Sequence, residues 1–323
     1  MEGKRAWLDE IERLTDVLSI IISHTCKEEG RKMEGAGTWF DELERRGVPL
    51  SETQRQKINE KMREILSYEP RVGIFGKTGV GKSSLCNALF GQVVCPISDI
   101  AACTRNPQEV ILNVGTKGIK LLDVPGVGEN LERDEEYAAL YAKLLPELDL
   151  VLWLVKADDR AMASDEKFFK NVVKPHLEQG KPFFFVINQV DKIEPYREWN
   201  DEKHEPSPQQ FQNIHKKIHS VAEQFSFPAS KVVPVSASER YNLAQLVDEI
   251  VFALPKEKTV TMFRAVDDAF KSETAERQVK KNFLEIVGDV IQGVAEGAKE
   301  LVKDVVFDAG VWLINHLPWW WPL

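Results

Sequence analysis

Apolar and polar positions divide the chain into two helical flanks and a central region with a different pattern. In residues 1–69 the apolar side chains recur every three or four positions, which predicts amphipathic helices. One helix is expected over residues 52–66, because Ser51 stands three positions before Gln54 in the pattern of a capping box. The apolar set of residues 255–323 returns to the helical period. Both ends of the chain are therefore predicted to be helical.

Between these flanks, residues 70–254 alternate short apolar runs with helical patterns. Several runs are almost continuously apolar, as expected for strands that helices cover on both faces. Residues 115–118 separate the second run from the third, a spacing typical of an antiparallel hairpin. The predicted fold class is α/β, with a mostly parallel sheet and a helical domain or extension built from the N- and C-terminal segments. The predicted strands are residues 71–75, 108–113, 120–124, 150–155, 183–188 and 231–235.

Composition fits a folded chain of about two domains. Of the 323 residues, 43% are hydrophobic and 29% are charged, which argues against wholesale disorder. The net charge of −9 gives the whole molecule no electrostatic attraction for nucleic acid. The four cysteines form no C-x-x-C pair, so a reducing, cytoplasmic location is expected. No uncharged apolar stretch reaches the length of about 18 residues that predicts a transmembrane helix.

The strongest chemical signal is a glycine-rich segment that follows the first predicted strand. Residues 76–83 read GKTGVGKS and fit the pattern G-x-x-x-x-G-K-[ST]. Glycines let the backbone curl until its N–H groups point at phosphate oxygens, and the helix that follows adds its dipole. The segment predicts a phosphate-binding loop whose contacts come from Gly76, Lys77, Thr78, Gly79, Val80, Gly81, Lys82, Ser83 and Ser84.

Two motifs indicate what surrounds the phosphates. Lys82 is expected to reach the β- and γ-phosphates, and the Ser83 hydroxyl to bind Mg²⁺. Residues 123–126 follow a later strand in the pattern D-x-x-G. There Asp123 is expected to hold Mg²⁺ through water, and the Gly126 N–H to sense the γ-phosphate. The aspartate pair at 158–159, which follows another predicted strand, is interpreted as a loop feature rather than a metal site.

Two further segments favour GTP over ATP. Residues 188–191 close an apolar strand and resemble the guanine-reading pattern N-K-x-D, and residues 236–238 resemble the S-A-K loop. A carboxylate at Asp191 can accept hydrogen bonds from guanine N1–H and the exocyclic amine, a donor pair that adenine lacks. The guanine contacts are predicted to come from Asn188, Gln189, Asp191, Ser236, Ala237 and Ser238.

The order of these motifs carries a family resemblance over residues 70–254. This region is similar to G domains of the Era/TrmE type, in the translation-factor class of P-loop GTPases. Within it, the segments GKTGVGKSSLCNALFG, ACTR, DVPGVGE and LVLWLVKADDRA resemble the YfjP/YkfA group of bacterial GTPases. The resemblance implies a parallel-rich nucleotide-binding sheet and an enzyme that hydrolyses GTP to GDP and phosphate.

The resemblance also implies roles for single residues and exposes three departures. Thr104 matches the switch threonine that closes over Mg²⁺, so Lys82, Thr104 and Gly126 are the predicted catalytic residues. Val127 stands where Ras-like proteins place a water-orienting glutamine, so a low intrinsic rate is expected. Gln189 replaces the usual lysine, which predicts weaker affinity with guanine selectivity retained. Gly79 stands where an asparagine often helps to bind K⁺, which weakens the case for K⁺ stimulation.

The C-terminal tail admits two interpretations. Residues 309–323 are uncharged except for a histidine and contain four tryptophans, a residue type that favours membrane interfaces. In one interpretation residues 283–323 contact a membrane surface, which would make the protein a peripheral membrane protein. In the other, the tail packs with the N-terminal helices as a small domain. The predicted units are an N-terminal helical segment 1–69, a G domain 70–254 and a C-terminal helical segment 255–323.

The predicted function is a Mg²⁺-dependent GTPase of low intrinsic rate that acts as a nucleotide-dependent switch or self-assembles. A homo-oligomer is the expected form in the second case. The alternatives are a membrane-associated GTPase whose tryptophan-rich tail is gated by nucleotide, and a ribosome-associated GTPase. The acidic charge and the lack of a recognisable RNA-binding module count against the ribosome.

Overall fold

The structure is a computed structural model that describes most of the central region and part of each flank. The tryptophan-rich tail lies outside the described residues, and so do Thr78, Thr104 and Gly126. Among the helices that are described, none is long and apolar enough to cross a membrane. The described residues are 51–66, 68, 70–77, 79–91, 108–112, 119–123, 142–159, 162–177 and 180–290.

The described strands form one six-stranded sheet in the order β2-β3-β1-β4-β5-β6. Strands β2 and β3 pair antiparallel, and every other neighbouring pair in this sheet is parallel. Each predicted strand is present with its bounds within one residue of the prediction, so the mostly parallel sheet and its antiparallel hairpin are confirmed. The strands are β1 Arg71–Phe75, β2 Gln108–Leu112, β3 Ile119–Asp123, β4 Leu150–Lys156, β5 Phe183–Asn188 and β6 Val232–Pro234.

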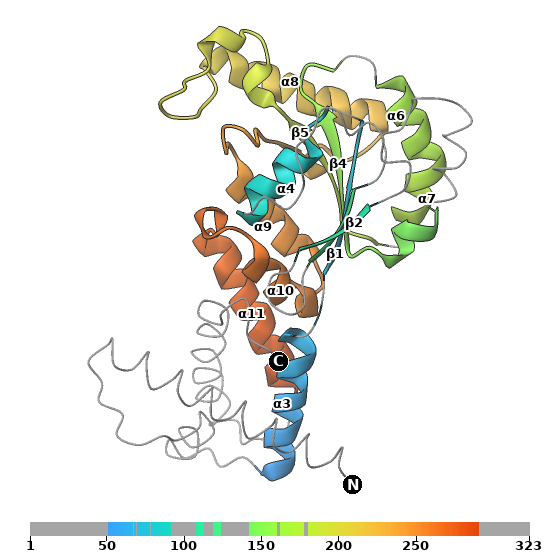
Figure 1. The fold of residues 1–323 in the computed structure, drawn as a ribbon, viewed down its shortest axis with the longest axis vertical. Helices are drawn as coiled ribbons and strands as arrows, with labels where there is room; N and C mark the ends of the chain where they lie inside the picture. Colours follow the sequence, from blue (N-terminus) through green and yellow to red (C-terminus); the bar gives the residue numbers. More distant parts are fainter. Residues whose placement is uncertain are drawn as a thin grey trace.

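Helices cover both faces of the sheet (Figure 1). Helices α4 and α9 lie on one face, and α6 and α7 lie on the other. A π-helical turn, Phe169–Val173, joins α6 to α7. The described helices are α3 Glu52–Leu66, α4 Lys82–Phe90, α6 Ala163–Phe168, α7 Lys174–Leu177, α8 Pro208–Phe225, α9 Leu243–Ala253, α10 Lys256–Ala265 and α11 Glu273–Val290.

Strand β4 shows why two separate cores form. Successive side chains of a strand point to opposite faces, so an unbroken apolar run supplies both. Its residues divide accordingly, with Leu150, Leu152 and Leu154 in the first core and Val151, Trp153 and Val155 in the second.

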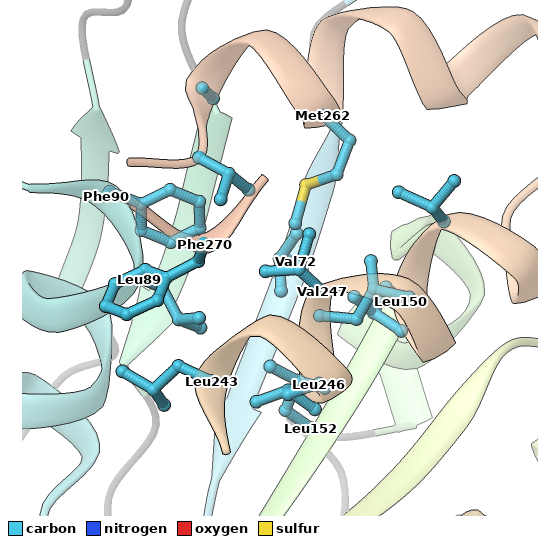
Figure 2. Close-up of a cluster of buried hydrophobic side chains, with 14 of the residues drawn as sticks. Val72, Leu89, Phe90, Leu150, Leu152, Leu243, Leu246, Val247, Met262 and Phe270 are labelled. Carbon is cyan, nitrogen blue, oxygen red and sulfur yellow. The ribbon is translucent and has the colours of Figure 1, made fainter. Parts of the chain in front are cut away.

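The first core joins the sheet to the C-terminal helices (Figure 2). Val72 of β1 lies between Met262 of α10 and Val247 of α9 in this view, and all three side chains are buried. Buried residues of α11, including Phe283, belong to the same core. The described part of the C-terminal flank therefore packs on the sheet itself.

The second core is built on aromatic side chains. Phe169, in the π-helical turn, lies with its ring centroid 5.1 Å from Phe185 of β5 and 5.6 Å from Phe225 of α8. Phe185 and Phe225 are themselves 4.4 Å apart. Aromatic pairs at such separations favour tilted or edge-to-face packing, which these pairs adopt. The contacts fix β5 and α8 relative to each other, and both elements lead into the site described below.

The two flanks meet at the end of the sheet where β1 and β4 begin. Helix α3 packs against α10 and α11 (Figure 1). Its start has the predicted capping box, with Ser51 N–H donating to Gln54 Oε1 at 2.9 Å. Beyond α3, the Tyr68 hydroxyl donates to Asp149 Oδ2 at 2.6 Å, and Lys258 of α10 forms an ion pair with Asp149. The buried Asp149 thus holds the N-terminal flank, the sheet and α10 together.

Candidate functional site

The site lies at the carboxyl ends of the parallel strands, the usual place for ligand sites in open α/β sheets. The loop 76–81 leaves β1 there and enters α4 at Lys82. Gly76 and Gly81 have φ angles of 137° and 89°, a region that L-residues rarely adopt. A Cβ at Gly76 would lie 2.4 Å from Leu154 O, and one at Gly81 would lie 2.4 Å from Asn188 Nδ2. Conformation and crowding both require glycine at these two positions.

Lys82 folds back onto the start of this loop. Its Nζ donates to Gly76 O at 3.0 Å and to Lys77 O at 3.2 Å. The first turn of α4, where Lys82 and Ser83 lie, also presents backbone N–H groups that have no partner within the helix. Positive charge from the lysine and from the helix terminus therefore meets at one place.

Asn188, the last residue of β5, connects two loops. Its Nδ2 donates to Val80 O at 2.9 Å, and its Oδ1 accepts from Ala237 N at 3.1 Å. The side chain is almost completely buried, with 1% of the residue exposed. One amide therefore joins the loop after β1 to the segment 236–238 after β6, two of the predicted motifs.

Gln189 braces the loop after β1 in place of the lysine usual in the pattern N-K-x-D. Its Nε2 donates to Gly79 O at 3.0 Å, from a left-handed backbone with φ of 65°. Lys192 Nζ donates to Gln189 Oε1 at 3.0 Å, which fixes the orientation of the amide. Gln189 therefore contacts the phosphate loop through a neutral donor, and the positive charge of Lys192 lies three residues further along the chain.

Asp191 is held by the segment after β6. Ser236 Oγ donates to Asp191 Oδ1 at 2.5 Å and lies 3.1 Å from Ser238 Oγ. From α8, Gln210 Nε2 donates to Ile193 O at 3.1 Å and to Asp191 O at 3.4 Å. The carboxylate of Asp191 is therefore held by the segment after β6, and its backbone carbonyl is held by α8.

An ion pair in the phosphate loop was not anticipated from sequence. Lys77 Nζ lies 2.6 Å from Asp165 Oδ2 and 3.4 Å from Asp159 Oδ2. Burial raises the pKa of the Asp165 carboxyl above its ordinary value, despite the opposing effect of Lys77. Burial lowers the pKa of Lys77, but pairing with Asp165 and Asp159 together outweighs burial and leaves that pKa raised. Local sequence carries no sign of the pair, because Asp159 is 82 positions from Lys77.

A cleft of about 940 Å³ opens beside Asp191. Its walls come from the loop after β4, the loop after β5 and helix α8. Asp159 and Lys217 line it together with Asp191, and Lys217 Nζ donates to Asp159 O across it. The interpretation of residues 158–159 as a simple loop feature is therefore incomplete, since Asp159 connects α8 to the loop after β1.

The remaining predicted residues are placed only in part. Asp123 ends β3 and pairs in register with Ile74 of the adjacent β1, two positions before Gly76. Ser83 lies in the first turn of α4, so both residues belong to the edge of the sheet that carries the phosphate loop. Hydroxyl and carboxylate oxygens are ligands that suit Mg²⁺, and these positions fit that ion. Thr78, Thr104 and Gly126 lie outside the described residues.

Comparison with known proteins covers most of the chain. Residues 71–189 match the family model described as 50S ribosome-binding GTPase. YfjP of Escherichia coli K12 is 41% identical over 249 residues, which cover 77% of this chain and 84% of YfjP. YkfA of the same strain is 42% identical over 240 residues, which cover 74% of this chain and 81% of YkfA.

More distant similarity extends to GTPase Era. Era of Aquifex aeolicus is 32% identical over 189 residues, which cover 57% of this chain and 56% of Era. A solved structure of an Aquifex aeolicus Era variant bound to GDP and aluminium fluoride has a TM-score of 0.44 and 30% sequence identity. That match covers 57% of this chain and 56% of the Era chain.

Proposed function

Since this chain is a P-loop GTPase of the family that contains YfjP and YkfA, we propose that the residues described above form its GTP site. One observation carries the proposal. Asn188 joins the phosphate loop to the segment 236–238, and Ser236 holds Asp191 at the same place. Phosphate-binding and guanine-reading groups from distant parts of the chain thus surround a single site.

The phosphates bind to the curled backbone of residues 76–83 and to Lys82. The lysine amine already contacts two carbonyls at the start of the loop, so its ammonium is held close to the incoming β- and γ-phosphates. The N-terminus of α4 adds a favourable dipole for the same anionic groups. Binding here neutralises negative charge without contact to the base.

Ser83 and Asp123 would hold Mg²⁺, the latter through water. When bound, the ion neutralises charge on the phosphate oxygens during transfer to water. Thr104 as a further ligand and Gly126 as the sensor of the γ-phosphate remain predictions, because both lie outside the described residues. With this assignment Lys82, Thr104 and Gly126 act on the reacting phosphate.

Guanine is selected by Asp191. The hydrogen bond from Ser236 fixes the direction of the Asp191 carboxylate. A fixed carboxylate accepts the two donors on the Watson–Crick edge of guanine, whereas adenine would leave it unpaired. Gln189 covers the base from the side of the phosphate loop, where its amide contacts Gly79 O.

The biological role that we propose is a slow nucleotide-dependent switch, with self-association as the accelerating event. Val127 has no hydrogen-bonding side chain, so it cannot orient the attacking water as a glutamine does. A second copy of the chain, or another protein, then supplies the missing group. Membrane contact through residues 283–323 was predicted, but Phe283 and Ile286 are buried in the first core. Membrane contact by the part of this segment beyond α11 stays a prediction, and so does ribosome binding.

Nucleotide affinity tests the site directly. Lys82→Ala should weaken GDP and GTP binding at least about 10-fold, the effect of losing charge-assisted hydrogen bonds to phosphate. Asp191→Asn should shift the preference from GTP toward xanthosine triphosphate. Binding is measured with fluorescent nucleotides. Lys281→Met serves as the control, because the Lys281 side chain lies on the exposed side of α11.

Two results would contradict the assignment. Unchanged GDP affinity in Lys82→Ala would exclude residues 76–83 as the phosphate loop. Equal affinity of the wild-type chain for ATP and GTP would exclude the guanine assignment. Phosphate release per molecule, measured at rising protein concentration, tests the switch separately. A rate that increases with concentration supports acceleration by self-association, and a constant rate contradicts it.

A further inference from the structure

Lys77 belongs to the phosphate loop, but its side chain contacts two carboxylates outside that loop. The loop motif fixes glycine, lysine and serine at other positions, and leaves position 77 open. Here that position carries a lysine whose amine lies 2.6 Å from Asp165 and 3.4 Å from Asp159. The Asp165 side chain is only 4% exposed, so the pair is shielded from water on one side.

Both carboxylates stand on elements that are themselves held in place. Asp165 is in the first turn of α6, which continues into the π-helical turn that carries the aromatic core. Asp159 follows the end of β4, and Lys217 of α8 donates to its carbonyl. Through these two carboxylates, Lys77 is attached to the scaffold formed by β4, α6 and α8.

The backbone of the same residue contacts the lysine that binds phosphate. Lys82 Nζ donates to Lys77 O at 3.2 Å, and Val80 N donates to the same oxygen at 3.5 Å. The Lys77 carbonyl that accepts from Lys82 and the Lys77 amine that pairs with Asp165 thus belong to the same residue. The ion pair with Asp165 and the hydrogen bond from Lys82 are therefore connected through Lys77.

We propose that Lys77 is a positioning residue for GTP binding, whose ion pair with Asp165 holds the phosphate loop and Lys82 in the conformation that accepts the phosphates. This inference rests on the proposed assignment of residues 76–83 as the phosphate loop. Stability alone does not explain the pair, because a buried ion pair can be replaced by apolar side chains with little or no loss of stability. Positioning requires the directional contact, and an apolar pair cannot supply it.

The test separates folding from nucleotide binding. Lys77→Met and Asp165→Asn each leave one partner unmatched, and the double variant Lys77→Met/Asp165→Leu removes both charges. Lys77→Arg keeps the charge and the reach. Lys170→Met is the matched control, because Lys170 pairs at 2.6 Å with Glu166 on the exposed side of the same helical segment. Each protein is measured for urea midpoint, GDP affinity, and KM and kcat for GTP.

The double variant is expected to keep a urea midpoint close to that of the wild type while its GDP affinity falls about 10-fold or more. Its KM for GTP should rise, whereas Lys77→Arg should bind within about threefold of the wild type. Full recovery of both stability and affinity in the double variant would reduce the pair to a structural role and overturn the inference. Folded single variants with wild-type affinity would overturn it as well.

Failure of the proposed function gives a different result. If the wild-type chain binds neither GDP nor GTP, the assignment of the phosphate loop fails and this inference fails with it. If the wild type binds, Lys82→Ala does not, and the Lys77 and Asp165 variants bind normally, only the positioning role is lost. The control Lys170→Met should leave affinity unchanged in both cases.

Discussion

At the scale of single residues, Gln189 illustrates how a neutral side chain can replace part of what a lysine does. A lysine at this position would contact the phosphate loop with a charged amine, and Gln189 contacts it with an amide N–H, 3.0 Å from Gly79 O. The adjacent Lys192 holds the amide oxygen at 3.0 Å. Glutamine can make the contact that a lysine would make here, because the amide and the amine are both N–H donors of similar reach.

A substitution series measures the value of this contact. Gln189→Ala should weaken GDP binding about 3- to 10-fold, since a single neutral hydrogen bond contributes about 0.5–1.5 kcal/mol. Gln189→Lys should bind at least as well as the wild type, because it restores a donor and adds a charge. Fluorescent GDP titration gives the affinities, with Lys281→Met as control. If Gln189→Ala binds as the wild type does, the amide makes no energetic contribution.

At the scale of elements, α8 connects the core to the guanine-reading loop. Ser207 caps the helix, with Gln210 N donating to Ser207 Oγ at 3.2 Å and Ser207 N donating to Gln210 Oε1 at 3.0 Å. The other end of the Gln210 amide reaches the carbonyls of Ile193 and Asp191. Gln210 is fully buried, so one side chain both closes the cap and fixes the loop that carries Asp191.

Two cap variants should therefore behave differently. Ser207→Ala is expected to lower the free energy of unfolding by about 1 kcal/mol, the usual cost of losing an N-cap, with GDP affinity unchanged. Gln210→Ala should lower stability further and also weaken GDP binding, because buried carbonyls near Asp191 lose their donor. Urea unfolding and GDP titration are measured on the same preparations. Equal affinity in the two variants would show that α8 does not position the loop.

At the scale of the whole molecule, the flanks and the sheet are joined through Asp149. Tyr68 precedes β1, Asp149 precedes β4, and Lys258 lies in α10. Burial raises the pKa of Tyr68, and its hydrogen bond with Asp149 adds to the effect. Burial lowers the pKa of Lys258, but its contacts with Asp149 and Tyr68 together outweigh burial, so the pKa is raised. Both groups hold their protons more firmly in the folded protein than in the unfolded chain.

This junction predicts a loss of stability in alkali. The contribution is fully present below the ordinary pKa values of tyrosine and lysine, about 10 and 10.4, and is lost as pH rises through the higher folded values. Urea midpoints at pH 8 and pH 11 measure it. The double variant Tyr68→Phe/Lys258→Met should lose less stability between the two pH values than the wild type, and Lys281→Met should behave as the wild type. If the double variant loses as much stability between pH 8 and pH 11 as the wild type does, the loss does not come from Tyr68 and Lys258.

Local patterns along the chain were sufficient to predict the strands and helices of the described residues. Strands, helices, the antiparallel hairpin and the capping box at Ser51 depend on periodicity and on contacts between near neighbours, so a local pattern is sufficient to predict them. The phosphate loop was equally local, because its glycines act through their own backbone angles.

Which distant side chains meet depends on tertiary packing, and no local pattern predicts it. Gln189 and Gly79 are 110 positions apart, Asn188 and Val80 are 108 apart, and Lys258 and Asp149 are 109 apart. Strand order brings the first two pairs together, since β1 lies next but one to β5. The third pair forms because α10 packs on the sheet beside the start of β4. Lys77 shows the consequence most clearly. Its place in the loop was evident from local pattern, but its partner Asp165 follows only from the packing of α6 against the sheet.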